Sequence, residues 1–377
     1  MMDKKERMMD KKERMIEQEI DRRKFLRGLG LGIGGATLGI YGANGETIKP
    51  VEGPAMGVVV HSYWARWNSK TASDNYPSFT NALQLLRHCK EIGAGGIQVT
   101  LNDWTDDFTK KMRDEREKLG LYMEGSIGLP KNESDVPRFE AQLVYAKEAG
   151  AKILRTVCLS GRRYENFHSQ AEFQHFKSIA INSLRLAEPI VRKHKIKLAV
   201  ENHKDWRAEE MVELIKLIQS EWVGVTLDFG NNISLLENPM EVIKTLAPYS
   251  FSTHVKDMGV QEYEKGFLLS EVPLGQGIVD LPAAVALCKK LNPSITFNLE
   301  MITRDPLKIP CLDAAYYETM GDISSSALAK TLGMVRERKF EGKLPSTSQL
   351  TGEQALAFEE KNIVDCLQYS KSKLGLG

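Results

Sequence analysis

Cysteine is scarce in this chain, and no two cysteines lie close together. Only five occur among the 377 residues: Cys89, Cys158, Cys288, Cys311 and Cys366. Zinc knuckles and redox-active CxxC motifs need closely spaced cysteines, so this spacing excludes both. The odd count argues against a complete disulfide framework. We expect these side chains to be buried as small hydrophobic groups.

Net charge and a basic surface are also lacking. The formal charge is +1, and residues 1–27 carry ten of the 51 basic side chains but only seven of the 50 acidic ones. The rest of the chain is therefore close to neutral, whereas binding to a phosphate backbone requires a broad basic surface. Nucleic acid is not expected as a partner. The apolar content of 42% and the charged content of 27% fit a globular protein with a substantial core.

The weakly apolar stretch near the N-terminus is too short to span a membrane. It covers residues 28–42, only 15 residues, whereas a membrane-spanning helix needs about 20. It follows Asp-Arg-Arg-Lys-Phe-Leu-Arg at residues 21–27, and the two together resemble a twin-arginine export signal. We expect residues 1–48 to be this signal and a linker, the protein to be exported to the periplasm, and membrane contact to occur only through the signal. A GxGxxG pattern at residues 30–35 has no flanking strand and crossover helix, so a dinucleotide site is not expected there.

Apolar, β-branched runs recur eight times in the rest of the chain. They cover residues 56–60, 95–101, 121–127, 151–159, 196–200, 223–227, 249–255 and 295–301. Segments with helical periodicity lie between them, for instance residues 78–92, 136–149, 173–194, 208–220 and 281–291. This alternation predicts an α/β fold, a (β/α)8 TIM barrel over residues 55–303. Residues 304–377 are expected to be a helical extension packing on the barrel, with a capping box at Thr351 and Gln354 that opens a helix toward Tyr369.

Four potential metal ligands each close one of these apolar runs. They are Glu201, Asp228, His254 and Glu300, separated by 27, 26 and 46 residues. Such separations fit a strand, a loop and a crossover helix, so the carboxyl ends of parallel strands would bring the four together. Three converging carboxylates repel one another without a cation. We therefore predict one divalent metal ion, with Mn²⁺ preferred and Co²⁺, Zn²⁺ or Mg²⁺ also suited to this ligand set.

Several short motifs resemble those of the xylose-isomerase-like TIM barrels, the sugar isomerase and epimerase group. They are Glu201-Asn202-His203, Leu227-Asp228-Phe229-Gly230-Asn231, His254-Val255-Lys256-Asp257, the loop at residues 273–277, and Glu300. The resemblance implies that the four ligands hold the metal at the top of the barrel and that Glu201 and Glu300 act as acid and base. His203 and Lys256 are expected near the metal, orienting a hydroxyl or donating to a developing oxyanion. For His203 the alternative is to fix a ligand, and for Lys256 it is a structural ion pair, for instance with Asp257.

Aromatic and hydrogen-bonding residues near the ends of the earlier strands suit a sugar. The candidate substrate contacts are His61, Trp64, Trp104, Glu124, Arg155 and Asn231. Either tryptophan could instead pack in the core, and Arg155 could be an internal ion-pair partner. Asn231 departs from a histidine found at this position in some epimerase-like members, and an amide cannot shuttle a proton near pH 7. This departure argues against a simple transfer of the ketose-epimerase mechanism.

The sequence favours a metal-dependent sugar isomerase or epimerase that removes a proton beside a carbonyl. Because no P-loop is present and export is expected, the partner should be an unphosphorylated sugar or glycoside. One alternative is a 3-keto-glycoside lyase that eliminates the C1 substituent, and another is a non-catalytic sugar-binding protein. An abasic-site endonuclease of the same fold would need more histidine ligands and a basic groove. A homo-oligomer is compatible with the sequence.

Overall fold

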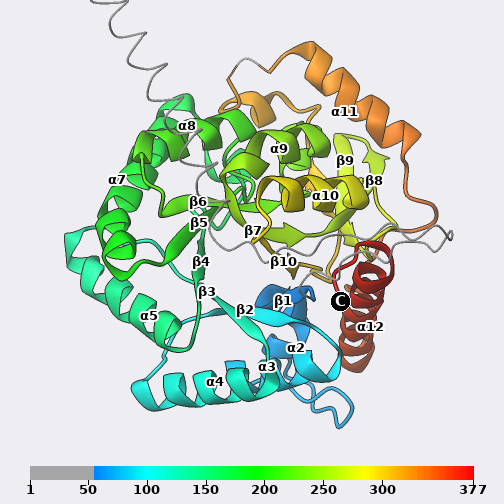
Figure 1. Ribbon diagram of the computed structural model, residues 1–377. Helices are drawn as coiled ribbons and strands as arrows, with labels where there is room; N and C mark the ends of the chain where they lie inside the picture. The colour runs from blue at the N-terminus through cyan, green and yellow to red at the C-terminus, as the bar shows by residue number, and fades with distance from the viewer. Residues whose placement is uncertain (1–54, 322) are drawn as a thin grey trace, which may run out of the picture. The chain divides into compact units, whose positions relative to one another are not determined.

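The computed structural model describes residues 55–321 and 323–377, and a closed barrel of eight parallel strands lies at its centre (Figure 1). The barrel strands are β1 (Gly57–Val59), β2 (Gly96–Thr100), β3 (Tyr122–Ser126), β4 (Ile153–Thr156), β5 (Lys197–Glu201), β6 (Val223–Asp228), β7 (Ser250–Val255) and β10 (Thr296–Leu299). They follow one another around the barrel in chain order, and β10 closes onto β1. Each of the eight predicted runs overlaps one of these strands, so the α/β barrel prediction is confirmed.

Helices connect the strands and surround the barrel (Figure 1). They are η1 (Val60–Tyr63), α2 (Trp64–Asn68), α3 (Ala82–Glu91), α4 (Asp106–Leu119), η2 (Glu133–Asp135), α5 (Val136–Glu148), α6 (Arg163–Asn166), α7 (Gln170–His194), α8 (Ala208–Ile218), η3 (Asn231–Leu235), α9 (Pro239–Leu246), η4 (Ala247–Tyr249) and α10 (Leu281–Leu291). Helix α8 illustrates their amphipathic pattern, because Met211, Leu214 and Ile215 are buried while Glu213 and Lys216 are exposed. The five helical segments named from the sequence are all present.

The register of the strands sets the predicted ligands side by side. Asp228 on β6 is paired with His254 on β7, and Glu201 on β5 is paired with Thr226. Glu201 and Asp228 are the last residues of their strands, and Glu300 follows the end of β10. Parallel strands present their carboxyl ends at the same end of a barrel, so the ligands meet there.

A second, antiparallel sheet was not predicted. It consists of β8 (Asp257–Tyr263), β9 (Gly266–Val272) and β11 (Leu307–Ile309), in the order β11-β9-β8. The hairpin β8–β9 and helix α10 together fill the 46-residue separation between His254 and Glu300, which was interpreted as a loop and a crossover helix only. Gly266 at the hairpin has a φ of 148°, and a Cβ atom there would lie 2.2 Å from the carbonyl oxygen of Ile309.

This second sheet has a hydrophobic core of its own. Val260, Phe267, Leu269 and Ile309 are buried with Val335 from helix α11 (Ser325–Glu337), and η5 (Ala314–Tyr317) contributes to the same cluster. Figure 1 shows α11 next to β8 and β9. The inserted hairpin therefore forms a layer beside the barrel.

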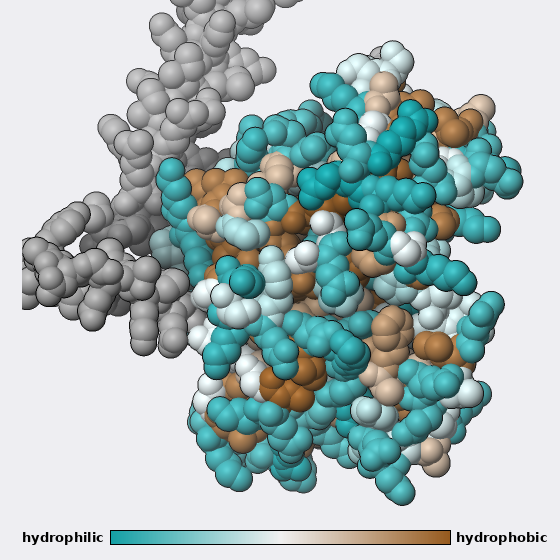
Figure 2. All heavy atoms as spheres, turned by 90° about the vertical axis from the view of Figure 1, so that its right-hand side faces the viewer, coloured by the Kyte–Doolittle hydropathy of each residue, from teal (hydrophilic) through white to brown (hydrophobic). Residues whose placement is uncertain are grey.

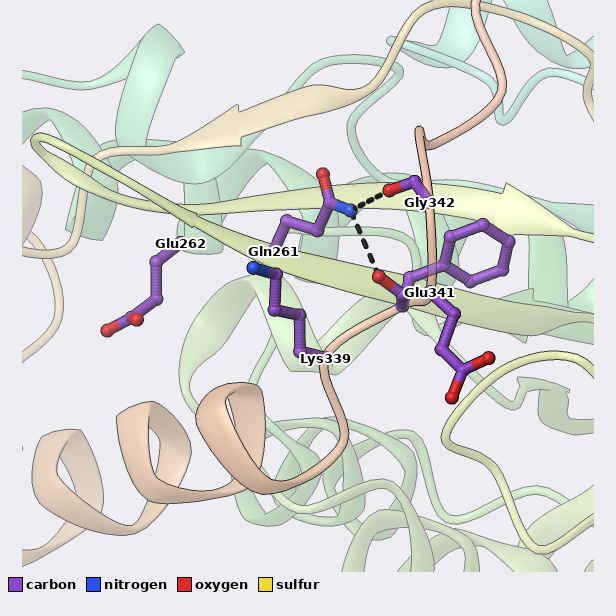
Figure 3. Close-up of a pocket in the computed structure, with 6 residues that line it drawn as sticks. Gln261, Glu262, Lys339, Glu341 and Gly342 are labelled. Carbon is purple, nitrogen blue, oxygen red and sulfur yellow. Dashed lines mark hydrogen bonds between the residues drawn. The ribbon is translucent and has the colours of Figure 1, made fainter.

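The edge of this sheet is covered by an irregular segment after α11. Gln261 on β8 donates from Nε2 to the carbonyl oxygens of Phe340, at 3.1 Å, and Gly342, at 2.6 Å (Figure 3). A surface cavity of about 580 Å³ lies here. It is lined by Gln261, Glu262, Lys339, Phe340, Glu341 and Gly342. None of these residues belongs to the predicted metal site.

The C-terminal helix α12 (Gly352–Lys373) lies beside the barrel (Figure 1). The predicted capping box is present, because Thr351 Oγ1 accepts from Gln354 N and Gln354 Oε1 accepts from Thr351 N. Glu359 of α12 is fully buried and accepts from the backbone N–H groups of Ala65, at 2.6 Å, and Arg66, at 2.9 Å. Helix α12 thereby holds the short helix that follows β1.

The surface that carries α11 and α12 is mostly hydrophilic, with hydrophobic residues in separate small patches (Figure 2). Among the described residues no helix is long and apolar enough to cross a membrane. Four of the five cysteines are buried, as predicted, and all five are free thiols. Cys158 is only half-buried and lies beyond the end of β4 at Thr156. The predicted export signal lies outside the described residues.

Candidate metal centre

The four predicted ligands form one buried cluster. Each of Glu201, Asp228, His254 and Glu300 offers an atom, and these atoms all lie within 4.8 Å of one another. The relative exposure of the four residues is between 0% and 4%. Such a group of three carboxylates and one imidazole can hold a divalent metal ion.

The orientation of His254 fits a metal ligand. Its Nε2 lies 2.8 Å from Gln98 Oε1, and Gln98 Nε2 donates to Glu124 Oε2 at 2.9 Å. The amide orientation is set by this second bond, so His254 Nε2 carries the proton that Gln98 accepts and Nδ1 faces the cluster. His254 Nδ1 has no hydrogen-bond partner and lies 3.4 Å from Glu201 Oε2 and from Glu300 Oε1. A metal ion is the partner that this arrangement accommodates.

The charges in the cluster shift the pKa values of its members. Burial alone would lower the pKa of His254, but the carboxylates of Glu300 and Glu201 raise it to about 10. Burial acts to raise the pKa of Glu201 and Glu300, yet nearby cations, chiefly Arg155 for Glu201 and Lys256 for Glu300, hold both well below the usual range. Burial raises the pKa of Asp228. A bound dication would take the place of the proton on His254 Nδ1.

Hydrogen bonds from the protein fix the ligand carboxylates. Arg155 Nε donates to Glu201 Oε2 at 2.7 Å, and Asn231 Nδ2 donates to Glu201 Oε1 at 3.0 Å. Asp228 Oδ1 accepts from the backbone N–H groups of Gly230 and Asn231. Arg155 and Asn231, which were predicted to contact substrate, are thus buried hydrogen-bond partners of Glu201, one of the four predicted ligands.

Lys256 bridges two of the ligands. Its Nζ lies 2.8 Å from Asp228 Oδ2 and 2.5 Å from Glu300 Oε2. An ion pair of Lys256 with Asp257 was considered from the sequence, but Asp257 instead accepts from the backbone N–H groups of the loop at residues 275–279. Lys256 therefore lies beside the candidate metal centre and is paired with two of its carboxylates.

His203 is half-buried near Glu201, and its Nδ1 has no hydrogen-bond partner. Burial and the charge of Lys204 lower the pKa of His203 to about 3. The imidazole is therefore neutral at pH 7 and can donate or accept one hydrogen bond, as a group that orients a hydroxyl must.

The remaining predicted substrate contacts lie in different places. His61 Nδ1 is 3.4 Å from Glu300 Oε1, and its ring centroid is 6.4 Å from that of Trp64, which is 57% exposed. These two residues lie at the carboxyl end of the barrel, where a sugar would approach. Trp104 is 8% exposed and packs edge-on against Phe108, as in the alternative of core packing, and its role as a substrate contact stays a prediction.

Glu124 needs correction, because it does not lie at the mouth of the barrel. It is the third residue of β3, and its carboxylate accepts from Gln98 Nε2, Ser252 Oγ, Thr296 Oγ1 and Asn298 Nδ2 inside the barrel. It lines a cavity of about 910 Å³ formed by residues at the amino-terminal ends of the strands. The alternation of side chains along a strand predicts that Glu124 points into the barrel. It does not predict how far from the carboxyl end of the barrel the side chain lies.

Sequence reasoning missed several groups at the centre. Lys204 is 4% exposed and donates from Nζ to Asn231 Oδ1. Burial, together with the charges of Lys256 and Arg304, lowers the pKa of Lys204 to about 8. Arg304 Nη2 is 2.6 Å from Glu271 Oε1 on β9, an oxygen that lies 4.0 Å from Lys256 Nζ. The position of Lys204, three residues after Glu201, was a signal in the sequence, whereas nothing local pointed to Glu271.

Comparisons with known proteins agree with this fold. A family model described as "Xylose isomerase-like TIM barrel" matches residues 86–319, and the chain belongs to this family. The chain is 26% identical over 236 residues to the 3-oxo-isoapionate decarboxylase of Pectobacterium atrosepticum, covering 61% of this chain and 78% of that protein. It is 28% identical over 197 residues to the uncharacterized protein YihM of Escherichia coli, covering 52% of this chain and 56% of that protein.

Two solved structures share the fold. A xylose isomerase-like TIM barrel protein from Mycobacterium smegmatis in complex with magnesium superposes with a TM-score of 0.50 at 18% identity, covering 74% of this chain and 97% of that one. A D-psicose 3-epimerase in the presence of D-fructose has a TM-score of 0.56 at 16% identity, covering 85% of this chain and 99% of that one. At these identities the likeness shows the barrel fold.

Proposed function

We propose that this protein is a divalent-metal-dependent enzyme that removes a proton beside the carbonyl of an unphosphorylated sugar, as an isomerase or epimerase. The observation that carries the proposal is the buried Glu201, Asp228, His254 and Glu300 cluster at the carboxyl ends of the strands. Family membership and the enzymatic names of the 3-oxo-isoapionate decarboxylase and the D-psicose 3-epimerase support it. Mn²⁺ is the metal that we propose.

A metal ion held by these four residues would supply Lewis acidity, withdrawing electron density from a substrate carbonyl. Side chains of the protein would transfer the proton and orient the substrate. Glu201 and Glu300 each present a carboxylate that can take a proton from carbon or return one. Lys256, next to Glu300, can donate to the oxygen on which negative charge develops, and the neutral His203 can orient a hydroxyl.

The exposed indole of Trp64 provides a face for a sugar ring beside His61. Since aromatic faces favour the C–H side of sugars and the metal ligands are oxygen-rich, a polyhydroxylated carbonyl compound matches both. We also propose that residues 1–48 direct export to the periplasm, based on the arginine pair and the uncharged stretch at residues 28–42.

A second candidate is a lyase reaction at the same centre. The match to a decarboxylase favours it, because cleavage of a bond beside a carbonyl develops the same negative charge on the carbonyl oxygen as proton removal does. For a 3-keto-glycoside, the base would take the C2 proton, the electron pair would form the C1–C2 double bond, and the aglycone would leave with its oxygen and be protonated.

The proposal is tested with the full chain supplied with Mn²⁺ in heavy water, with ketoses and 3-keto-glycosides as substrates and NMR as the readout. Deuterium entering beside the carbonyl supports isomerisation or epimerisation, and release of a free aglycone supports elimination. The Glu300→Gln variant should lose about 10²–10⁴-fold of the rate, as expected when a general acid–base group is removed, while still binding the sugar. Glu264→Gln, a matched change at an exposed glutamate in the turn between β8 and β9, should keep the rate.

Two outcomes would contradict this function. Sugar binding without turnover or exchange would indicate a non-catalytic binding protein, and full activity after removal of all divalent metal would exclude the metal-dependent mechanism.

A further inference from the structure

One buried cation at the centre lacks a counter-ion in the part of the chain that the structure describes. Lys204 is 4% exposed, and its Nζ donates to the neutral oxygen Oδ1 of Asn231. No carboxylate among residues 55–321 and 323–377 lies within 4.0 Å of this nitrogen. The neighbouring Asp205 uses its carboxylate oxygens for the backbone N–H groups of Leu159 and Trp206. An ammonium carries three N–H donors, so two of those on Lys204 have no protein acceptor there.

Lys256, at the same site, is a buried ammonium that is paired with carboxylates. Its Nζ contacts Asp228 Oδ2, Glu300 Oε2 and, at 3.4 Å, Asn231 Oδ1. Both ammonium groups therefore approach one amide oxygen, but only that of Lys256 is paired with carboxylates. A buried ammonium without a counter-ion destabilises the folded protein, and ionisable groups in such environments cluster at functional sites.

The charges of the side chains at the centre also favour an anionic ligand. Four carboxylates face four cationic side chains: Glu201, Asp228, Glu271 and Glu300 on one side, and Arg155, Lys204, Lys256 and Arg304 on the other. The charges of these eight side chains sum to zero, and His254 carries one further proton until a metal ion replaces it. A dication held with a neutral His254 would add two positive charges that none of these eight side chains offsets, so an anionic ligand would be favoured over a neutral one.

We propose that Lys204, together with Arg304, binds the carboxylate of a sugar acid, so that the substrate of this centre is an acidic rather than a neutral sugar. Arg304 fits this role because Nε and Nη2 pair with Glu271 while the side chain remains 32% exposed. The inference rests on the proposed function and specifies its substrate class. The competing explanation is that Lys204 only orients Asn231, which in turn donates to Glu201.

The test compares D-gluconate with D-glucitol, which share a carbon chain and differ in having a carboxylate or a hydroxymethyl group at C1. Binding of each to the Mn²⁺-loaded full chain is measured by calorimetry. We expect gluconate to bind at least tenfold more tightly than glucitol. Lys204→Met should lower the affinity for gluconate at least tenfold and leave that for glucitol unchanged, because only the carboxylate needs the ammonium. Lys216→Met, the same change at an exposed lysine of α8, should preserve the preference.

Equal affinities in the unchanged protein would overturn the inference. So would an undiminished gluconate preference in Lys204→Met, since the carboxylate would then be bound by the metal alone. If Lys204→Met fails to fold, Arg304→Met takes its place, and it should lower the ratio of gluconate affinity to glucitol affinity at least threefold. An undiminished ratio in Arg304→Met would also overturn the inference. A protein that binds Mn²⁺ and catalyses exchange on neutral ketoses without preferring gluconate would refute the substrate class and leave the proposed function standing. A protein that binds no metal would refute the function itself.

Discussion

Replacing Gln98 by leucine should weaken metal binding, although Gln98 is not a ligand. Its Oε1 accepts from His254 Nε2 and its Nε2 donates to Glu124, so it links the histidine of the candidate metal centre to a buried carboxylate on the neighbouring strand. Leucine has nearly the same size but removes both bonds. His254 would then be free to place its proton on Nδ1, the nitrogen that faces Glu201 and Glu300.

The expected loss has two parts that can be measured separately. Removing a partner that orients a metal-bound histidine typically lowers metal affinity by about 10–100-fold, which corresponds to about 1.4–2.7 kcal/mol. The buried N–H of His254 would also lose its acceptor, which costs about 1–3 kcal/mol of folding stability. Calorimetric titration with Mn²⁺ gives the first quantity, and denaturant unfolding in the presence of EDTA gives the second.

A matched control is available on β8. Gln261 also makes two amide hydrogen bonds, to Phe340 and Gly342 (Figure 3), but it contacts none of the four ligands. Gln261→Leu should leave the dissociation constant for Mn²⁺ unchanged. The reasoning would be refuted if Gln98→Leu lowered stability as expected but kept the Mn²⁺ affinity within twofold of the original, because Gln98 would then serve packing alone.

Three further changes have defined outcomes. Lys256→Met leaves Asp228 and Glu300 buried without their ammonium, so the free energy of unfolding of the metal-free protein should fall by about 3–5 kcal/mol. Thermal unfolding with Mn²⁺ should show that the metal restores part of this loss, and an equal loss with and without metal would contradict the reasoning. Trp64→Ala, at a 57% exposed position, should raise the KM for sugar about 2–10-fold with stability changed by less than about 0.5 kcal/mol, and an unchanged KM would exclude stacking. Burial raises the pKa of Glu359 from 4.5 to about 7, so the folded state keeps a proton that the unfolded chain releases, and stability should fall by up to about 3 kcal/mol as pH rises from 4.5 to 8. Unfolding of the EDTA-treated protein should show a shallower decline in Glu359→Gln, and the same slope in both proteins would reject the assignment.

The sequence alone determined the barrel and the identity of the predicted metal ligands. Strand runs with β-branched residues and the helical period between them are local properties, so all eight barrel strands were predictable. Glu201, Asp228, His254 and Glu300 could be named because parallel strands bring their carboxyl ends together whatever the details of packing. The roles assigned to these residues in catalysis stay predictions.

Only the tertiary structure decided which other groups join the centre and at what depth. Glu124 and Gln98 point inward as the alternation of a strand requires, yet the stagger between strands places Glu124 below the ligands and Gln98 against His254. The second sheet forms because β8 pairs with β9 and β9 pairs with β11, about 40 residues away in the chain, and no local pattern encodes the pairing with β11. Whether Lys204 is paired or lacks a counter-ion likewise depends on contacts distant in sequence, because burial and charge compensation are properties of the assembled site.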